Sequence, residues 1–259
     1  MINISERFYM RKYLFLLIFL VEMIAAVPLF AGEPELKVLG VGGLIATSPY
    51  DGVDSTVMPV PVMKWDYKGF YVRGAEGGYS FYDQGGIRLG IVTSPRLMGY
   101  HSDDSTALNG MEDRRLSWDA GVKAEIDLSF VQGLSLSAQI LNDVLSRYDG
   151  REGRIALKQS YVSRYFRCSA EAGAKVQSRQ LTDYYYGVGA AEARGGRSAY
   201  AAGTAVNPLM GLMLTTGVSR NWLIIGRVEV ERLDSTIRKS PIVSDSYTVM
   251  GTLGIARRF

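Results

Sequence analysis

The sequence has 259 residues, enough for one large domain or two small ones, and its 47% hydrophobic and 21% charged residues exclude an intrinsically disordered chain. One cysteine excludes a disulfide framework or a cysteine-rich zinc site, and one histidine excludes ordinary histidine-based metal sites. The 29 basic and 26 acidic residues are too evenly balanced to indicate nucleic-acid binding.

The first segment is predicted to be a signal peptide. Arg11 and Lys12 precede an apolar run from Tyr13 to Val21, and a second apolar stretch after Glu22 closes at the small residue Ala31. A membrane anchor is the alternative, but the uninterrupted run is well below the about 20 residues that a spanning helix needs. We therefore expect residues 1–31 to be removed and residues 32–259 to form the exported domain.

The rest of the chain is predicted to form β-strands, because apolar and polar residues alternate with a period of two. Eleven segments show this pattern. In chain order they include Leu36–Thr47, Val57–Tyr67, Phe70–Phe81, Ile87–Met98, Leu116–Phe130, Leu134–Ile140, Arg154–Phe166, Cys168–Gln177, Trp222–Glu231 and Tyr247–Phe259.

Leu116–Phe130 is the clearest of these segments. Every even position is apolar and every odd position is polar or glycine. The alternation is long for a soluble strand, which usually has about 5–6 residues, but it suits a tilted strand between lipid and a watery interior. The pattern favours an all-β, antiparallel transmembrane β-barrel over a secreted β-sandwich.

Short turns alternate with long polar loops, as in outer-membrane barrels, whose short turns face the periplasm. The turns are at 131–133, 166–167 and 220–221, and the loops are Gly99–Arg115, Leu181–Asn207 and Asp234–Asp245. Because such barrels have an even number of strands, we predict twelve, with ten as the alternative. A twelfth strand would lie hidden within Leu181–Asn207, or else one segment does not span the membrane.

The polar faces of the predicted strands carry both signs of charge. Two interpretations are open: a selective pore, or a lumen crosslinked by ion pairs. The balance of signs favours the second, because no ring of one sign is present to select one ion. The residues are Asp119, Lys123, Glu125, Asp127, Glu171, Lys175, Arg179, Arg227, Glu229 and Glu231.

Three other features are ambiguous at this stage. Pro59 and Pro61 cannot donate to a strand ladder, so they place the pairing of their strand in doubt or mark its end. The tyrosines at 184–186 are predicted to join an aromatic girdle at the membrane surface, with an adhesive patch as the alternative. His101 lies beside serine and aspartate residues, which suggests a barrel enzyme, but neighbours on one loop rarely achieve catalytic geometry.

Several short segments together resemble the MipA/OmpV family. They are Ser48–Asp54 with the Pro59-Val60-Pro61 strand, Tyr185–Val188, Ser240–Val243 and the terminal strand that ends in Phe259. The resemblance implies an outer-membrane barrel of a Gram-negative bacterium. It also implies a scaffold that brings a murein-degrading lytic transglycosylase and a murein synthase together, while other members are described as adhesins or porin-like proteins.

The family has no established active site, so the resemblance supplies no catalytic, cofactor-binding or metal-binding residues. Our main hypothesis is a non-enzymatic barrel that lies in the lipid bilayer and recruits periplasmic murein enzymes. A channel for small solutes and a surface adhesin are the alternatives, and an enzyme using His101 is a third.

Overall fold

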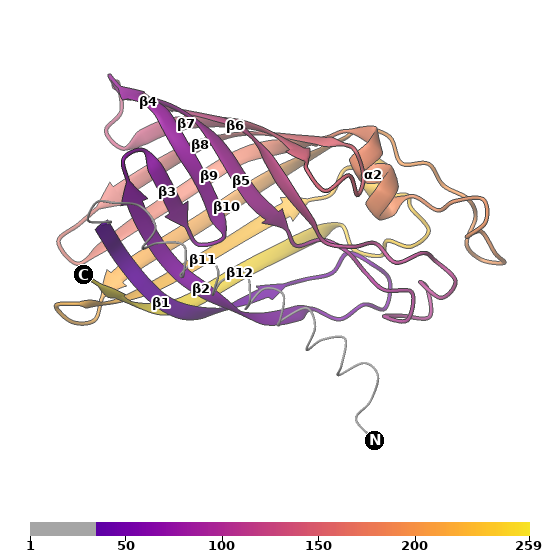
Figure 1. The fold of residues 1–259 in the computed structure, drawn as a ribbon. Coiled ribbons are helices and arrows are strands. Elements are labelled where there is room, and N and C mark those ends of the chain that lie inside the picture. The colour runs from indigo at the N-terminus through magenta and orange to yellow at the C-terminus, as the bar shows by residue number, and fades with distance from the viewer. Residues whose placement is uncertain (1–34) are drawn as a thin grey trace.

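The computed structural model describes residues 35–259, which form a closed antiparallel barrel of twelve strands (Figure 1). Each strand pairs with its neighbours in the sequence, and β1 closes the barrel against β12. The predicted signal peptide at residues 1–31 lies outside the described residues. Within the described part of the chain, no helix is long and apolar enough to cross a membrane.

The elements have the following bounds. The strands are β1 (Glu35–Ala46), β2 (Thr56–Tyr67), β3 (Phe70–Arg73), β4 (Glu76–Gln84), β5 (Ile87–Arg96), β6 (Ser117–Asp127), β7 (Leu134–Asp143), β8 (Arg151–Val162), β9 (Phe166–Gln177), β10 (Ala205–Gly217), β11 (Trp222–Arg232) and β12 (Tyr247–Arg258). The described helices are α2 (Arg179–Tyr186) and α3 (Ser235–Arg238).

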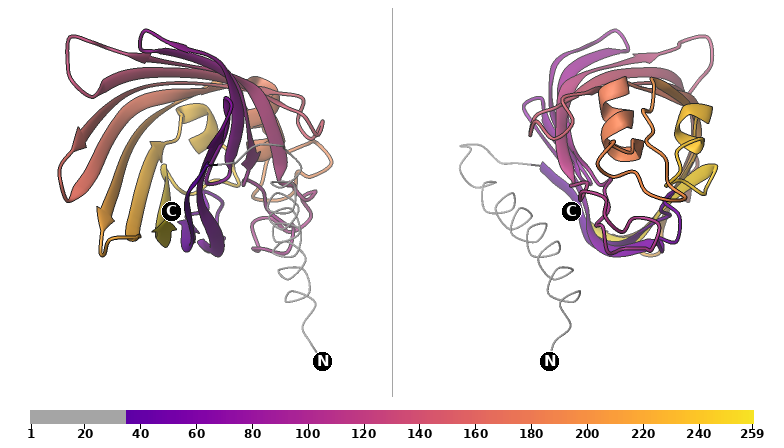
Figure 2. Two further views of the ribbon diagram at one scale, coloured as in Figure 1. Left: turned by 60° about the vertical axis from the view of Figure 1, so that its left-hand side comes forward. Right: turned by 90° about the vertical axis from the view of Figure 1, so that its right-hand side faces the viewer.

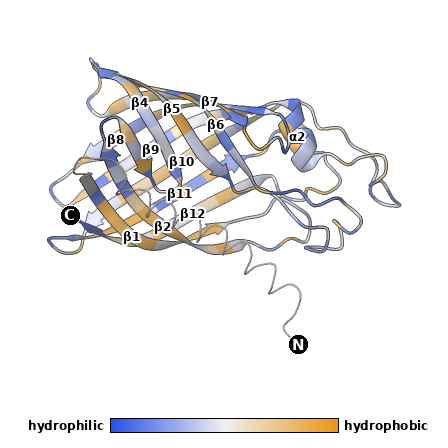
Figure 3. Cartoon of the chain, viewed as in Figure 1, coloured by the Kyte–Doolittle hydropathy of each residue, from blue (hydrophilic) through white to orange (hydrophobic). Residues whose placement is uncertain are grey.

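The alternation in the sequence becomes the two faces of the barrel wall. In β6, Val122 points outward and is 54% exposed, whereas Asp119 and Lys123 line the lumen. Apolar residues follow the strands at alternate positions (Figure 3). The predicted barrel is therefore confirmed: its outer surface is apolar enough for lipid, and its interior is polar.

The prediction of twelve strands is confirmed, but the predicted place of the hidden strand is wrong. The segment Phe70–Phe81 was expected to be one strand, and the structure divides it into β3 and β4 at Gly74 and Ala75. Gly74 has a φ of +63°, a conformation that glycine adopts without strain and that turns the chain here. The segment 181–207 instead contains most of helix α2.

The two ends of the barrel differ (Figure 2). The start of β1, the end of β12 and the short turns lie at one end, except the β3–β4 turn, which lies within the wall. The long loops and the two helices lie at the other end. The turn predicted at 166–167 lies at 163–165, because Phe166 already belongs to β9. From the usual layout of such barrels, we expect the turn end to face the periplasm and the loop end to face outward.

The two faces of β6 predict opposite responses to substitution. Val122→Arg should block assembly, because an arginine on the lipid face costs about 2–4 kcal/mol at the midplane. Lys123→Val should still assemble, since Lys123 faces the lumen and its loss leaves Glu76 near water. Heat-modifiable migration of outer-membrane extracts on gels measures assembly. Equal tolerance of the two changes would mean that the faces are misassigned.

Candidate functional site

The lumen is the candidate site, because it forms a cavity of about 2130 Å³ that runs through the barrel. Its lining reaches Gln132 and Arg220 in the turns at one end, and Tyr50 and Tyr186 near the loops at the other. The cavity has three zones along its length. They are a belt of ion pairs, an aromatic cap at the loop end and a basic mouth at the turn end.

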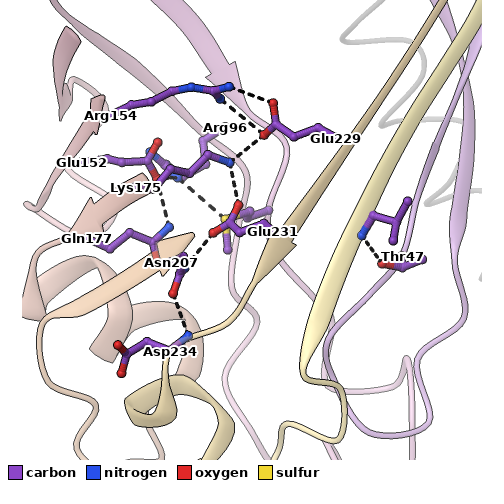
Figure 4. Close-up of polar contacts among 12 residues, drawn as sticks. Thr47, Arg96, Glu152, Arg154, Lys175, Gln177, Asn207, Glu229, Glu231 and Asp234 are labelled. Atoms are coloured by element: carbon purple, nitrogen blue, oxygen red, sulfur yellow. Dashed lines mark hydrogen bonds and ion pairs between the residues drawn. The ribbon is translucent and has the colours of Figure 1, made fainter. Parts of the chain in front are cut away.

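Glu229 of β11 is the centre of the ionic belt (Figure 4). Its carboxylate pairs with Arg154 of β8 at 3.0 Å and with Lys175 of β9 at 3.0 Å. Arg227 contacts the same carboxylate at 2.9 Å. Lys175 also reaches Glu231 at 2.6 Å, so the pairs form one network that joins three strands across the lumen.

A second group of ion pairs lies nearer the cap. The guanidinium of Arg96 in β5 is buried and pairs with Asp119 at 2.6 Å and with Glu152 at 2.9 Å. Tyr148 donates its hydroxyl to Asp119, and Gln177 donates its side-chain amide to Glu152 at 3.0 Å. Each buried charge therefore has a partner, as low-dielectric surroundings require.

Nine of the ten charged residues predicted for the polar faces line the lumen cavity. Arg179 is the exception, and this prediction is wrong: it is the first residue of α2 and is exposed. The interpretation as a crosslinked lumen is confirmed by the ion pairs. Sequence analysis missed Arg96, Glu152 and Arg154, because the alternation in their strands is weak.

The aromatic cap is a buried hydrophobic cluster at the loop end. Helix α2 contributes Leu181, Tyr185 and Tyr186, which are almost completely buried. The prediction that tyrosines 184–186 join an aromatic girdle is therefore wrong for Tyr185 and Tyr186. The other members of the cluster are Tyr50, Tyr100, Leu108, Met111, Tyr148, Val188, Ala202, Ala205, Leu233, Ile237 and Ile242.

Glu192 ties two of the long loops together above this cluster. Its carboxylate pairs with Arg114 at 2.9 Å and accepts from the backbone N–H groups of Glu112 and Gly189. Burial raises the pKa of the Glu192 carboxyl. The hydrogen bonds from both N–H groups and the charge of Arg114 outweigh that effect, so the net pKa is lowered.

His101 lies in the loop that follows β5. Its ring nitrogen Nδ1 is 2.9 Å from Asp113, its backbone N–H donates to Asp104, and the N–H of Ser102 donates to Asp113. Burial raises the pKa of Asp113, but the hydrogen bonds from His101 and Ser102 lower it by more, so the net pKa is lowered. These contacts hold the loop in shape at the outer end.

The turn end of the lumen carries an excess of positive charge. Asp66 and Asp127 bring negative charge to this end, and Asp66 pairs with Lys37 at 3.5 Å and with Arg73 at 3.9 Å. The basic side chains outnumber them and create a positive potential at the mouth. The basic mouth comprises Lys37, Lys64, Arg73, Lys158, Arg164, Arg167, Arg220 and Arg258.

The family model described as MltA-interacting protein MipA matches residues 39–259, which include almost the whole barrel. The chain belongs to this family. The MltA-interacting protein of Escherichia coli (strain K12) is 26% identical over 224 residues, which are 85% of this chain and 89% of that protein. Outer membrane protein OmpV of Vibrio cholerae is 28% identical over 170 residues, 65% of each chain.

Among solved structures, a bacterial polysaccharide outer membrane secretin aligns with a TM-score of 0.43 and 10% identity, covering 87% of this chain and 99% of its own. The MipA-family assignment and the named relatives establish this protein as an outer-membrane β-barrel. The ionic belt, the cap and the basic mouth are thus features of a MipA-family lumen.

Removing the central carboxylate should destabilise this MipA-family barrel. Glu229→Gln leaves Arg154 and Lys175 short of a partner, and the side chain is only 11% exposed, so we expect a loss of about 3 kcal/mol. Asp83→Asn is the control, since Asp83 is 60% exposed and its pair with Arg88 contributes below about 1 kcal/mol. Urea unfolding in vesicles measures both. Equal losses would show that the belt contributes nothing beyond a surface pair.

The cap should loosen in acid. A carboxyl whose pKa is lowered by folding stabilises the fold above its ordinary value, about 4.3, and loses this contribution as the pH falls through the lowered value. Glu192→Gln should therefore weaken tyrosine packing at pH 7 and shrink the change on acidification. Near-ultraviolet circular dichroism of the tyrosines measures this. The exposed Glu112→Gln is the control, and an unchanged acid response in Glu192→Gln would contradict the assignment.

Proposed function

We propose that this protein is a non-enzymatic outer-membrane scaffold that docks murein enzymes at the periplasmic end of its barrel. The observation that carries the proposal is the difference between the two ends. The aromatic cap covers the outer end of the barrel, whereas the basic mouth lies at the turn end, where periplasmic proteins reach the barrel. The name of the Escherichia coli relative, MltA-interacting protein, supports a protein partner of this kind.

The turns at the mouth have the composition of a docking surface. Phe130 and Tyr165 lie in two of the turns and are 76% and 73% exposed. Arg164 is adjacent to Tyr165 in the turn between β8 and β9, and Arg220 lies in the next turn along the rim, between β10 and β11. Aromatic and arginine side chains dominate the binding energy of protein interfaces, so the partner should present an acidic surface with apolar recesses.

The structure gives less support to the channel, adhesin and enzyme hypotheses. A porin-like channel along the axis has to pass the aromatic cap, whose core side chains are buried against one another. An adhesin would bind its target through the outer loops. The tyrosines of those loops that belong to the cap are buried, so they do not offer an adhesive surface. The contacts of His101 with Asp113 and Asp104 fix a loop, which favours a structural role over catalysis.

Charge reversal at the two ends tests the scaffold. Arg164→Glu with Arg220→Glu should lower the capture of murein enzymes by roughly tenfold, since an exposed ion pair contributes about 0.2–1 kcal/mol and each reversal adds repulsion. Arg147→Glu with Lys239→Glu is the matched control, because both residues are exposed on the outer side. Cross-linking pull-down from envelope extract measures capture.

Charge reversal is preferable to trimming the loop 97–116, because that loop supplies Tyr100, Leu108 and Met111 to the cap. Heat-modifiable migration verifies that both double variants assemble. Capture that is lost in the outer pair and retained in the turn pair would overturn the proposed orientation and the scaffold function with it.

A further inference from the structure

The barrel wall has an interruption between β2 and β5. Strand β3 has four residues, so β2 pairs with it only over Lys64–Tyr67. The part of β2 at Met58–Met63 pairs with β1 on one side and has no ladder on its other side within the described sheet. On the far side, the pairing of β5 with β4 ends at Thr93, and Ser94–Arg96 continue beyond it.

The prolines of β2 fit this free edge. Gly74 donates its N–H to the carbonyl of Met63, so the backbone polar groups of Met63 face the side of the interruption. Because these groups alternate along an antiparallel strand, the nitrogens of Pro59 and Pro61 face the same side. Proline is tolerated at a strand edge, because no neighbouring strand there needs a hydrogen bond from its missing N–H. The doubt that the prolines raised is thus resolved: they lie within β2 and mark its free edge.

The lumen cavity extends into the interruption. Met58 and Val62 belong to the inner face of β2, whereas Val57 and Pro61 belong to its outer face, and all four line the same cavity. The tip of the β3–β4 hairpin and the end of β5 complete the rim with Gly74, Ala75, Ser94 and Pro95. Lining by both faces of β2, at the place where the wall is interrupted, indicates a passage through the wall, which we call the side opening.

The side opening lies at the level of the hydrocarbon. On its other edge, β2 pairs with Leu39–Ala46 of β1 at this level of the wall. In that stretch Val41 and Ile45 point outward and are 60% and 49% exposed, so they belong to the lipid-facing band. The opening therefore faces acyl chains.

The lumen just inside the opening is amphipathic. Its near wall is apolar, with Val38 and Leu44 of β1 beside Met58 and Val62 of β2. Lys64 and Arg73 face each other across the last β2–β3 pair, directly below the opening, and both line the cavity. Asp66, which pairs with Arg73 at 3.9 Å, does not line the cavity, so the two basic side chains are the charges that β2 and β3 present to this part of the lumen. The ionic belt on β8, β9 and β11 lies on other strands and pairs its own charges.

We propose that the lumen takes an anionic amphiphile from the membrane through the side opening. The acyl chain lies along the apolar inner faces of β1 and β2, and the anionic head, a phosphate or a carboxylate, pairs with Lys64 and Arg73. The site shares Lys64 and Arg73 with the basic mouth but uses neither Arg164 nor Arg220, whose reversal tests docking, so failure of one proposal can be distinguished from failure of the other.

Quenching of tryptophan by brominated acyl chains tests the site. The native Trp65, Trp118 and Trp222 are replaced with phenylalanine, and one tryptophan is introduced by Met58→Trp. Full-length barrels are reconstituted in phosphatidylcholine vesicles that contain a minor brominated component: phosphatidylglycerol, phosphatidylcholine or a fatty acid. We expect strong quenching by the brominated phosphatidylglycerol or fatty acid and weak quenching by the brominated phosphatidylcholine.

Two matched positions serve as controls. Ile140→Trp faces lipid and should be quenched by every brominated lipid, whereas Gln139→Trp faces the lumen on β7 and should not be. Heat-modifiable migration confirms assembly of each variant. Adding Lys64→Gln and Arg73→Gln to Met58→Trp should abolish the preference for the anionic chain, at roughly fivefold per basic side chain.

Each quenching result either supports the proposed site or overturns it. Quenching by phosphatidylglycerol identifies a phosphate head, and quenching by the fatty acid identifies a carboxylate; either supports the site. Quenching at Met58→Trp no greater than at Gln139→Trp would overturn it. Equal quenching by anionic and zwitterionic lipids, unchanged by the two glutamine substitutions, would overturn the assigned role of Lys64 and Arg73.

Discussion

Backbone hydrogen bonding in hydrocarbon constrains every other feature of this protein. An unsatisfied N–H or C=O group there costs several kcal/mol, so the sheet has to close on itself. Closure comes from the antiparallel pairing of β1 with β12 over nine residue pairs from Val38 to Ala46. Where the wall is interrupted between β2 and β5, Pro59 and Pro61 remove two donors, and Pro61 and Met63 line the cavity.

Closure also creates the lumen, and the lumen must accommodate charges that point inward from different strands. Arg154, Lys175 and Glu229 satisfy one another because they come from β8, β9 and β11, which lie near one another around the wall. The belt crosslinks this side of the barrel. The wall of β1 and β2 has apolar inner faces instead, so the interior is polar on one side and apolar on the other.

Much of the fold could be predicted from the sequence, because a two-residue period assigns each side chain to one face and Val122 and Lys123 obey it. The short strand β3 could not, since four residues give too few alternations to separate it from β4. The cap was missed for a different reason. Tyr185 and Tyr186 are amphipathic residues whose place depends on contacts with loops far away in the sequence, and alternation carries no information about those contacts.

The cap is also coupled to the seam that closes the barrel. Tyr50, from the first outer loop, forms a bridge with Val243, from the last, and the N–H of Thr47 donates to the carbonyl of Val249 across the seam. These partners are about as distant along the chain as the barrel allows, and loop closure over such a span is slow. Both contacts lie beside the β1–β12 seam, so we expect them to form with it or after it. We therefore expect the cap to close late in folding, with its buried tyrosines packed over a finished seam.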